Sequence, residues 1–246
     1  LVDTPSDFGF NGGLPSHPQL LDRLATELIE HGYHLKPLHR IIVTTDAYRR
    51  DSRPRDEAID IDAESRTVWR RRPQRLDGES LRDSLLVVAG HWLQQIHGEG
   101  FSDYRTIDVM NGTVYYEPFD PLDATAQRRS IYRFVPRGGN QGLLDQFDCP
   151  DPAASAPRRN VTTTPLQALS LWNDGFTLRM SQELAARVES EQPADRDAQI
   201  ERVFRLTLQR APSDEEELGA SELAARFGLA AVARVLFNSS EFLTVE

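Results

Sequence analysis

The sequence predicts a mainly α-helical fold with a small antiparallel β element (α+β), with the helices in orthogonal or bundle-like packing. Three segments carry the S/T-x-x-E/Q capping box, in which the first and fourth residues satisfy each other's backbone donors at a helix start. These segments are residues 16–19, 164–167 and 213–216. β-branched and aromatic residues are enriched at 113–117 and 129–135, which predicts a hairpin or small sheet with a long connecting loop.

The spacing of apolar residues in the N-terminal part predicts three helices. The first follows the capping box at Ser16 and ends near Gly32, because Leu20, Leu24 and Leu28 recur at helical spacing. A short second helix covers residues 38–48. Residues 49–66 are charged and lose the apolar pattern, so we expect an excursion over the surface. Residues 76–95 recover the pattern and predict a long helix, with the apolar positions Leu81, Leu85, Val88 and Trp92.

The residue pattern of the C-terminal part predicts four helices after two irregular stretches. Residues 98–112 are rich in turn residues, and residues 145–161 are irregular and contain the run PDPAASAPRR. The predicted helices cover residues 165–189, 197–208, 214–227 and 229–238, and a short apolar tail follows them. Pro165 suits the first position of a helix, where its missing N–H has no partner to lose.

The length of 246 residues allows one large domain or two small ones. The pattern of predicted elements allows a subdivision into a helical part (1–112), a hairpin with loops (113–162) and a second helical part (163–246). Hydrophobic residues make up 39%, which is enough for a sizeable core. A net charge of −10 argues against broad binding of nucleic acid, since phosphate neutralisation needs a basic face. The longest apolar run is too short to insert into a membrane.

Motifs for cofactors and metals are missing from the sequence. Cys149 is the only cysteine, which excludes an internal disulfide, a cysteine zinc site and haem attachment through CxxCH within this chain. No HExxH zinc motif, no GxSxG elbow and no phosphate-binding glycine signature occurs. We therefore expect no metal site and no cofactor in this chain.

A cluster of polar residues in the C-terminal half is the main candidate for chemistry. Asn173 and Asp174 fall inside a predicted helix, where both side chains compete with the backbone for hydrogen bonds. One interpretation is a structural network, in which Arg129 or Arg159 pairs with Asp148 or Asp174 and clamps the irregular loop onto the helices. The other is a pocket for a sugar or an anionic group. Its lining candidates are Arg129, Arg158, Arg159, Trp172 and Asn173.

Six blocks in fixed order resemble a known family. They begin with LVDTPSDFGFNGGLPSHPQLLDRLA, HLKPLHRIIVTTDAYR and RRPQRLDGESLRDSLLVVAG, and continue with RRSIYRFVPR followed by FDCPDP, RRNVTTTPLQALSLWND and RVFRLTLQRAPSDEE. Together they closely resemble the planctomycetal PSD1 (DUF1553) domain over nearly the whole chain, which implies a single domain of this kind over residues 1–246. Asp7 and His17 lie in the first block, and we expect their role to depend on whether they face the cluster at 148–174.

The resemblance implies a domain context and a cellular location, but no reaction. Members of this family look like the C-terminal part of large exported proteins, with a DUF1549 domain before them and a c-type cytochrome-like or carbohydrate-binding module often nearby. The resemblance therefore implies an exported, periplasmic or extracytoplasmic location, companion domains in the same polypeptide, and haem on a partner domain. It also implies that an N-terminal segment of the family pattern is missing from this chain. No catalytic residues come with the resemblance.

Three hypotheses follow for the function. The first is a structural or interaction module that packs on its companion domains. The second is a polysaccharide-acting hydrolase with a carboxylate pair drawn from Asp3, Asp7, Asp148 and Asp174. The third is a sugar- or anion-binding module that uses Trp172 with the arginines beside it. The geometry of these side chains should separate the three.

Overall fold

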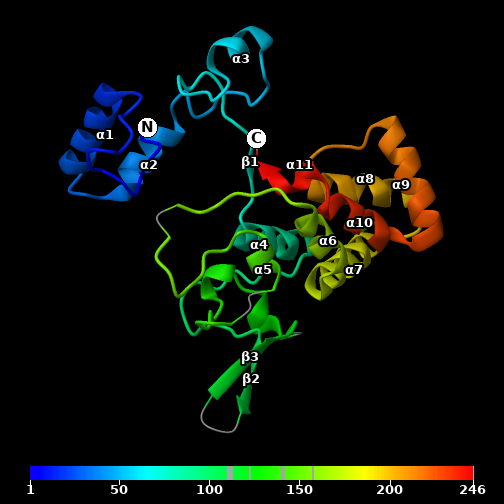
Figure 1. Ribbon diagram of the computed structural model, residues 1–246. Coiled ribbons are helices and arrows are strands. Elements are labelled where there is room, and N and C mark those ends of the chain that lie inside the picture. The colour runs from blue at the N-terminus through cyan, green and yellow to red at the C-terminus, as the bar shows by residue number, and fades with distance from the viewer. Residues whose placement is uncertain (110–112, 122, 140–141, 157, 246) are drawn as a thin grey trace. The chain divides into compact units, whose positions relative to one another are not determined.

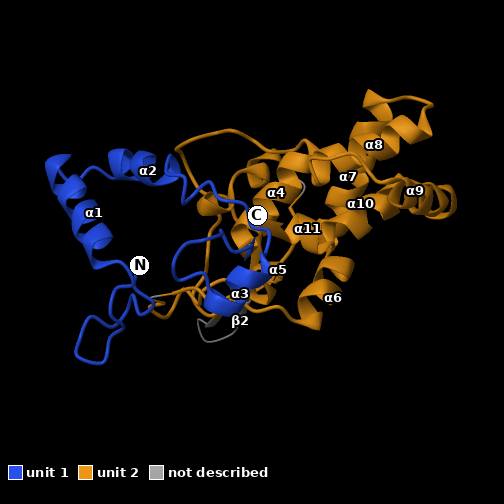
Figure 2. Cartoon of the chain, turned by 90° about the horizontal axis from the view of Figure 1, so that it is seen from above, with its two compact units in different colours: residues 1–74, 246 blue, residues 75–245 orange. Residues whose placement is uncertain are grey.

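A computed structural model describes residues 1–109, 113–121, 123–139, 142–156 and 158–245 (Figure 1). Helices dominate these residues, with two small two-stranded sheets, which confirms the predicted mainly α fold. Residues 1–74 and 75–245 form two compact units (Figure 2). The single-domain organisation and the internal boundaries at 112 and 162 stay predictions.

Residues 1–74 contain three helices: α1 (Pro18–Glu30), α2 (Leu35–Val43) and α3 (Asp56–Asp62). The turn between α1 and α2 contains Gly32 and Tyr33, both with positive φ. The predicted capping box at Ser16 is wrong, because α1 begins at Pro18 and His17 occupies the cap without a side-chain hydrogen bond. α3 lies within the stretch that the sequence predicted as an excursion without apolar pattern.

The helices of residues 75–245 supply the core. They are α4 (Gly78–Ala89), α5 (Leu143–Gln146), α6 (Pro165–Asn173), α7 (Gly175–Glu191), α8 (Arg196–Thr207), α9 (Asp214–Phe227), α10 (Leu229–Phe237) and α11 (Ser240–Leu243). Leu81 and Leu85 of α4, Met180 and Leu184 of α7 and Phe237 of α10 are fully buried in one cluster. α10 (LAAVARVLF) is apolar on most of its surface, which is typical of a helix at the centre of a core.

Three predicted helices differ clearly in extent from the observed ones, and the first of them, predicted over residues 38–48, is α2 (Leu35–Val43). The helix predicted over residues 76–95 ends at Ala89, because Gly90 adopts a left-handed conformation (φ +83°) and closes the helix. The helix predicted over residues 165–189 is two helices, α6 and α7, with Asp174 in an extended conformation between them. Asp174 is therefore a helix cap, and the apparent conflict of a helix-interior aspartate disappears.

The β part is also paired differently from the prediction. β2 (Tyr104–Val109) pairs antiparallel with β3 (Thr113–Pro118), and Ile107 lies opposite Tyr115. The strand predicted at 129–135 is wrong, since residues Ser130–Tyr132 form a turn of 3-10 helix (η2). A second 3-10 turn, η1 (Ala124–Gln127), precedes it. The second sheet pairs β1 (Gln74–Arg75) with β4 (Thr244–Val245).

Candidate functional site

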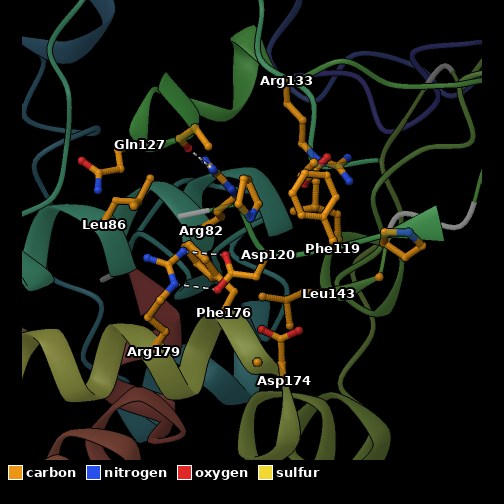
Figure 3. Close-up of a pocket in the computed structure, with 17 residues that line it drawn as sticks. Arg82, Leu86, Phe119, Asp120, Gln127, Arg133, Leu143, Asp174, Phe176 and Arg179 are labelled. Carbon is orange, nitrogen blue, oxygen red and sulfur yellow. Dashed lines mark hydrogen bonds and ion pairs between the residues drawn. The ribbon is translucent and has the colours of Figure 1, made fainter. Parts of the chain in front are cut away.

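A cavity of about 290 Å³ lies within residues 75–245 (Figure 3). α4 contributes Arg82 and Leu86, the segment after β3 contributes Phe119 and Asp120, and the start of α7 contributes Phe176 and Arg179. The other lining residues are Asp103, Pro118, Pro121, Ala126, Gln127, Arg133, Gly142, Leu143, Leu144, Asp174 and Gly175. The wall is thus mainly apolar, with charged groups at a few positions, which is typical of small-molecule sites.

Two arginine–aspartate pairs are built into the cavity wall. Arg179 donates two hydrogen bonds to the Asp120 carboxylate, and the one from Nε to Oδ2 measures 2.6 Å. Figure 3 shows the two side chains facing each other. Arg133 Nε donates to Asp103 Oδ2 at 2.7 Å, and its Nη2 donates to the hydroxyl of Tyr104 at 2.8 Å. The bidentate Arg179–Asp120 pair is strong and directional, and Arg133 is held by two different acceptors, so both arginines fix the shape of the wall.

Arg82 is a buried structural cation at the side of the cavity. Its guanidinium donates to the backbone oxygens of Ala126 (2.6 Å) and Arg128 (3.0 Å), and it stacks against the rings of Phe101 and Phe176. Burial lowers the pKa of Arg82 to about 10, although nearby aspartates oppose the shift. The side chain therefore replaces the backbone hydrogen bonds that this irregular segment lacks.

Asp174 joins α6 to α7 at the cavity. Its Oδ1 accepts hydrogen bonds from the backbone N–H of Thr177 (3.0 Å) and from the Thr177 hydroxyl (3.2 Å), which makes it the N-cap of α7. Its side chain lines the cavity together with Leu143, and both are labelled in Figure 3. Burial raises the pKa of Asp174, and the charge of Asp120 adds to that effect, while the Thr177 bonds oppose it.

Asp148 has a different role from Asp174. Its carboxylate accepts hydrogen bonds from the backbone N–H and the hydroxyl of Thr162, both at 2.8 Å, and forms an ion pair with Arg75. Arg75 also stacks on the buried ring of Phe147. Asp148 therefore ties residues 147–149 to the segment before α6.

Arg159 pairs with α4 instead of with an aspartate of the cluster. Its guanidinium makes two hydrogen bonds to Glu79, at 2.6 and 2.7 Å, and lies 3.5 Å from Asp77. Burial would raise the pKa of Glu79, but the Arg159 hydrogen bonds, a backbone hydrogen bond and the charge of Arg159 together hold that pKa below its usual value. The predicted pairing of Arg159 or Arg129 with Asp148 or Asp174 is wrong, since Arg129 lies 3.7 Å from Asp83.

The other predicted residues are not gathered at one site. Trp172 carries Arg234 stacked on its ring and accepts a hydrogen bond from Arg234 on its backbone oxygen. Asn173 donates to Leu169 O at 2.9 Å, and Arg158 is exposed on the irregular segment. Of all the predicted site residues, Asp174 alone lines the cavity.

Asp3, Asp7 and His17 belong to residues 1–74. Asp7 Oδ1 accepts a hydrogen bond from Gly9 N at 2.9 Å, and His17 Nδ1 lies 3.0 Å from Ser16 Oγ. Asp3 lies 3.8 Å from Arg66, with both side chains largely exposed. The contacts of Asp7 and His17 are local and lie in the segment that leads into α1. Their predicted link to the cluster at 148–174 stays a prediction.

A protein-family model matches most of the chain. The family model is PSD1, a protein of unknown function (DUF1553), and it matches residues 1–224. The chain belongs to the PSD1 family. No curated protein and no solved structure was found to match it. Its membership therefore places the chain in a family without assigning it a reaction.

The PSD1 cavity depends on residues that sequence reasoning did not single out, namely Arg82, Asp120, Phe176 and Arg179. The sequence did contain a signal for Arg82. Positions 82, 85, 86 and 89 form a buried stripe on α4, and an arginine at such a position is unusual because an apolar residue is expected there. Phe176 and Arg179 are three residues apart in α7 and so share a face. Nothing in the sequence indicates that Asp120 meets Arg179.

The described residues of this PSD1 chain offer neither a metal site nor a membrane span. No group of three or more His, Cys, Asp or Glu side chains lies close enough together there to hold a metal ion. None of the helices in that part of the chain combines the length and apolar content needed to cross a bilayer.

Cys149 is expected to react slowly with alkylating reagents. Burial and the neighbouring Glu79 carboxylate raise the pKa of its thiol to about 11. The thiolate is the reactive form, so alkylation by iodoacetamide should be far slower than for free cysteine at pH 8 and should rise with pH toward 11. Mass spectrometry of timed samples measures the rate. Rapid modification of folded protein at neutral pH would contradict this environment.

Asp174 is expected to stabilise the PSD1 fold through its cap. Asp174→Ala should cost about 1 kcal/mol of unfolding free energy and lower the melting temperature, because the Thr177 N–H loses its acceptor. Asp174→Asn keeps a capping oxygen and should cost little.

The pH dependence of these variants follows from the raised pKa of Asp174. Because the folded state binds the Asp174 proton more tightly than the unfolded state, this group's contribution to stability is complete below pH 3.8. It is lost as pH rises through the folded pKa. Asp174→Asn should therefore gain stability relative to wild type as pH rises from about 4 to 7, in denaturation curves at several pH values. If the difference in unfolding free energy between Asp174→Asn and wild type stays constant over this pH range, the carboxyl of Asp174 is not buried.

Proposed function

We propose that this PSD1 domain is a structural interaction module of a larger exported protein. Residues 75–245 serve as its stable body, and residues 1–74 dock on a companion domain of the same polypeptide. The companion is a DUF1549-like domain, with a cytochrome-like domain further along the assembly. Domain context and location come to this proposal from the family resemblance alone.

One observation supports the docking role most directly: residues 1–74 contribute no hydrophobic side chain to a buried core. The fully buried hydrophobic residues of the described chain begin at Leu81. α1, α2 and α3 contain no buried residue. Folded units of this size bury an apolar core of their own, so a helical unit without one normally completes its packing against something else.

The apolar residues needed for such packing are present and accessible. On α1, Leu21 and Ile29 are 37% and 58% exposed, and their spacing of eight residues places them on one face of the helix. On α2, Leu35 and Val43 are 58% and 44% exposed. Leu24, Leu28, Leu38, Ile41 and Ile42 are only half-buried, although the two helices contact each other. We name the side chains of Leu21, Ile29, Leu35 and Val43 the α1–α2 apolar surface. Exposed apolar patches mark interaction sites.

The contacts of the polar candidates also favour a structural role. Asp148 and Arg159 hold irregular segments in place, and Asp174 caps a helix. A glycosidase needs two carboxyl groups across one open cleft, and of the four candidate carboxylates only Asp174 lines the cavity. A sugar-binding platform needs an open aromatic face, whereas Arg234 covers the ring of Trp172.

The docking role predicts the effect of polar substitutions on α1. Leu21→Ser combined with Ile29→Ser should change the unfolding free energy of the 246-residue chain by less than about 0.5 kcal/mol, because both side chains are exposed. Chemical denaturation measures the difference. If the surface packs on residues 75–245 in solution, the loss should reach about 2–4 kcal/mol, and the proposal fails.

Binding to the companion is the second half of the test. Purified DUF1549-type domain from the same polypeptide is titrated into the chain and followed by calorimetry. Leu21→Asp with Ile29→Asp should weaken binding at least tenfold. Leu218→Asp on α9, where Leu218 is 64% exposed, provides a matched control that should bind like wild type. Equal binding by both variants would overturn the assignment of this surface.

A further inference from the structure

We infer that the cavity of residues 75–245 binds a small organic ammonium ion, with Asp174 as its counter-ion. This inference is independent of the docking role proposed for residues 1–74. It rests on the pairing of charges around the cavity, on its apolar wall, and on a buried acceptor oxygen that lacks a donor.

The charges of the cavity wall are paired, with one exception. Arg179 pairs with Asp120, and Arg133 pairs with Asp103. Arg82 is held by backbone oxygens and lies 3.7 Å from Asp83, outside the lining. Among the described residues, no basic side chain forms an ion pair with Asp174. A half-buried carboxylate without a countercharge is costly, and a cation placed beside it removes that cost.

A second acceptor in the lining also lacks a donor. Asp103 Oδ1 is buried and has no hydrogen-bond partner among the described residues, although Oδ2 of the same carboxylate accepts from Arg133. Buried acceptors without partners are rare in folded proteins and call for a donor. A primary ammonium carries three N–H donors and no acceptor, so its chemistry matches a site with surplus acceptors.

The remaining wall sets the size and nature of the rest of the ligand. Phe119, Phe176 and Leu143 surround the space near Asp174 and Asp120 (Figure 3). A cavity of about 290 Å³ lies at the small end of the range for ligand sites. The ligand class is therefore a primary amine with a short apolar or single-ring body. An anion would meet the carboxylates of Asp103, Asp120 and Asp174, while the arginines are already engaged.

The test uses three probes of one shape. Benzylamine, benzyl alcohol and benzoate are titrated into the folded chain at pH 7.5, and binding is followed by ligand-observed NMR and calorimetry. Benzylamine should bind at least tenfold more tightly than benzyl alcohol, and benzoate should not bind, because an ammonium–carboxylate hydrogen bond is about twice as strong as a neutral one. Equal binding of amine and alcohol, or no saturable binding of benzylamine up to about 10 mM, would overturn the inference.

Matched variants locate the site. Asp174→Asn keeps the cap and should weaken benzylamine binding about tenfold or more. Asp195 caps α8 through the same kind of bond, to Ala198 N at 3.0 Å, and does not line the cavity, so Asp195→Asn should bind like wild type. Both variants are first checked for an unchanged melting temperature within a few degrees. If Asp174→Asn is stable and binds benzylamine as tightly as wild type does, Asp174 is not part of the binding site.

Discussion

Replacing Arg82 by alanine is expected to lower the free energy of unfolding by about 3–5 kcal/mol. The guanidinium is buried, donates to the backbone oxygens of Ala126 and Arg128, and lies between the rings of Phe101 and Phe176. Alanine leaves those buried oxygens without donors and opens a void between the two rings. Urea denaturation followed by circular dichroism measures the change.

A conservative variant separates the hydrogen bonds of Arg82 from its charge. Arg82→Lys retains the positive charge but lacks the planar fork that reaches two carbonyls, so we expect a loss between wild type and Arg82→Ala. Arg23, whose side chain is 67% exposed on α1, is the matched surface position, and Arg23→Ala should cost less than about 1 kcal/mol. A loss below about 1 kcal/mol for Arg82→Ala would show that this arginine is not the clamp of residues 126–130.

Asp148→Ala is expected to cost about 3–5 kcal/mol, the second large effect. The Arg75 side chain is 10% exposed, and its Nε and Nη1 already lack hydrogen-bond partners, so Asp148 provides its countercharge. The variant leaves a buried guanidinium uncompensated and frees the segment that Thr162 attaches to Asp148. Differential scanning calorimetry measures the loss.

The control at this position is Asp148→Asn. Asp148 has a φ of +59°, a conformation that asparagine tolerates better than most residues, so the backbone should stay unstrained. The amide keeps one acceptor for Thr162 but loses the charge opposite Arg75, so its cost should fall between wild type and Asp148→Ala. If Asp148→Ala and Asp148→Asn unfold like wild type, Arg75 has another partner in solution.

The sequence predicted the helical elements best where local signals were strong. α9 begins at the predicted capping box, in which Ser213 Oγ accepts from Glu216 N and Ser213 N donates to Glu216. The predicted helix at 214–227 has the observed bounds. In contrast, α4 ends at Ala89, six residues before the predicted end at residue 95, because the left-handed conformation of Gly90 closes the helix. Asp174 ends α6 because its backbone is extended, and its side chain caps α7.

Pairing over long sequence distances could not be predicted. β3 pairs with β2, whose sequence (YRTIDV) was assigned to turns, because strand pairing is decided by tertiary packing more than by propensity. The same limit applies to the cavity. Asp174 stood out by its unusual place in the pattern, whereas the partners Asp120 and Arg179 are 59 residues apart and meet only in the fold.

Hydrogen exchange of the 246-residue chain, alone and with the DUF1549-type companion domain, tests the central claim most directly. Amides of α4, α7 and α10 should be strongly protected in both samples, because these helices form the core. Amides of α1 and α2 should exchange rapidly in the chain alone and become protected on addition of the companion. Strong protection of α1 and α2 in the isolated chain, or no change on addition, would contradict the docking role of residues 1–74.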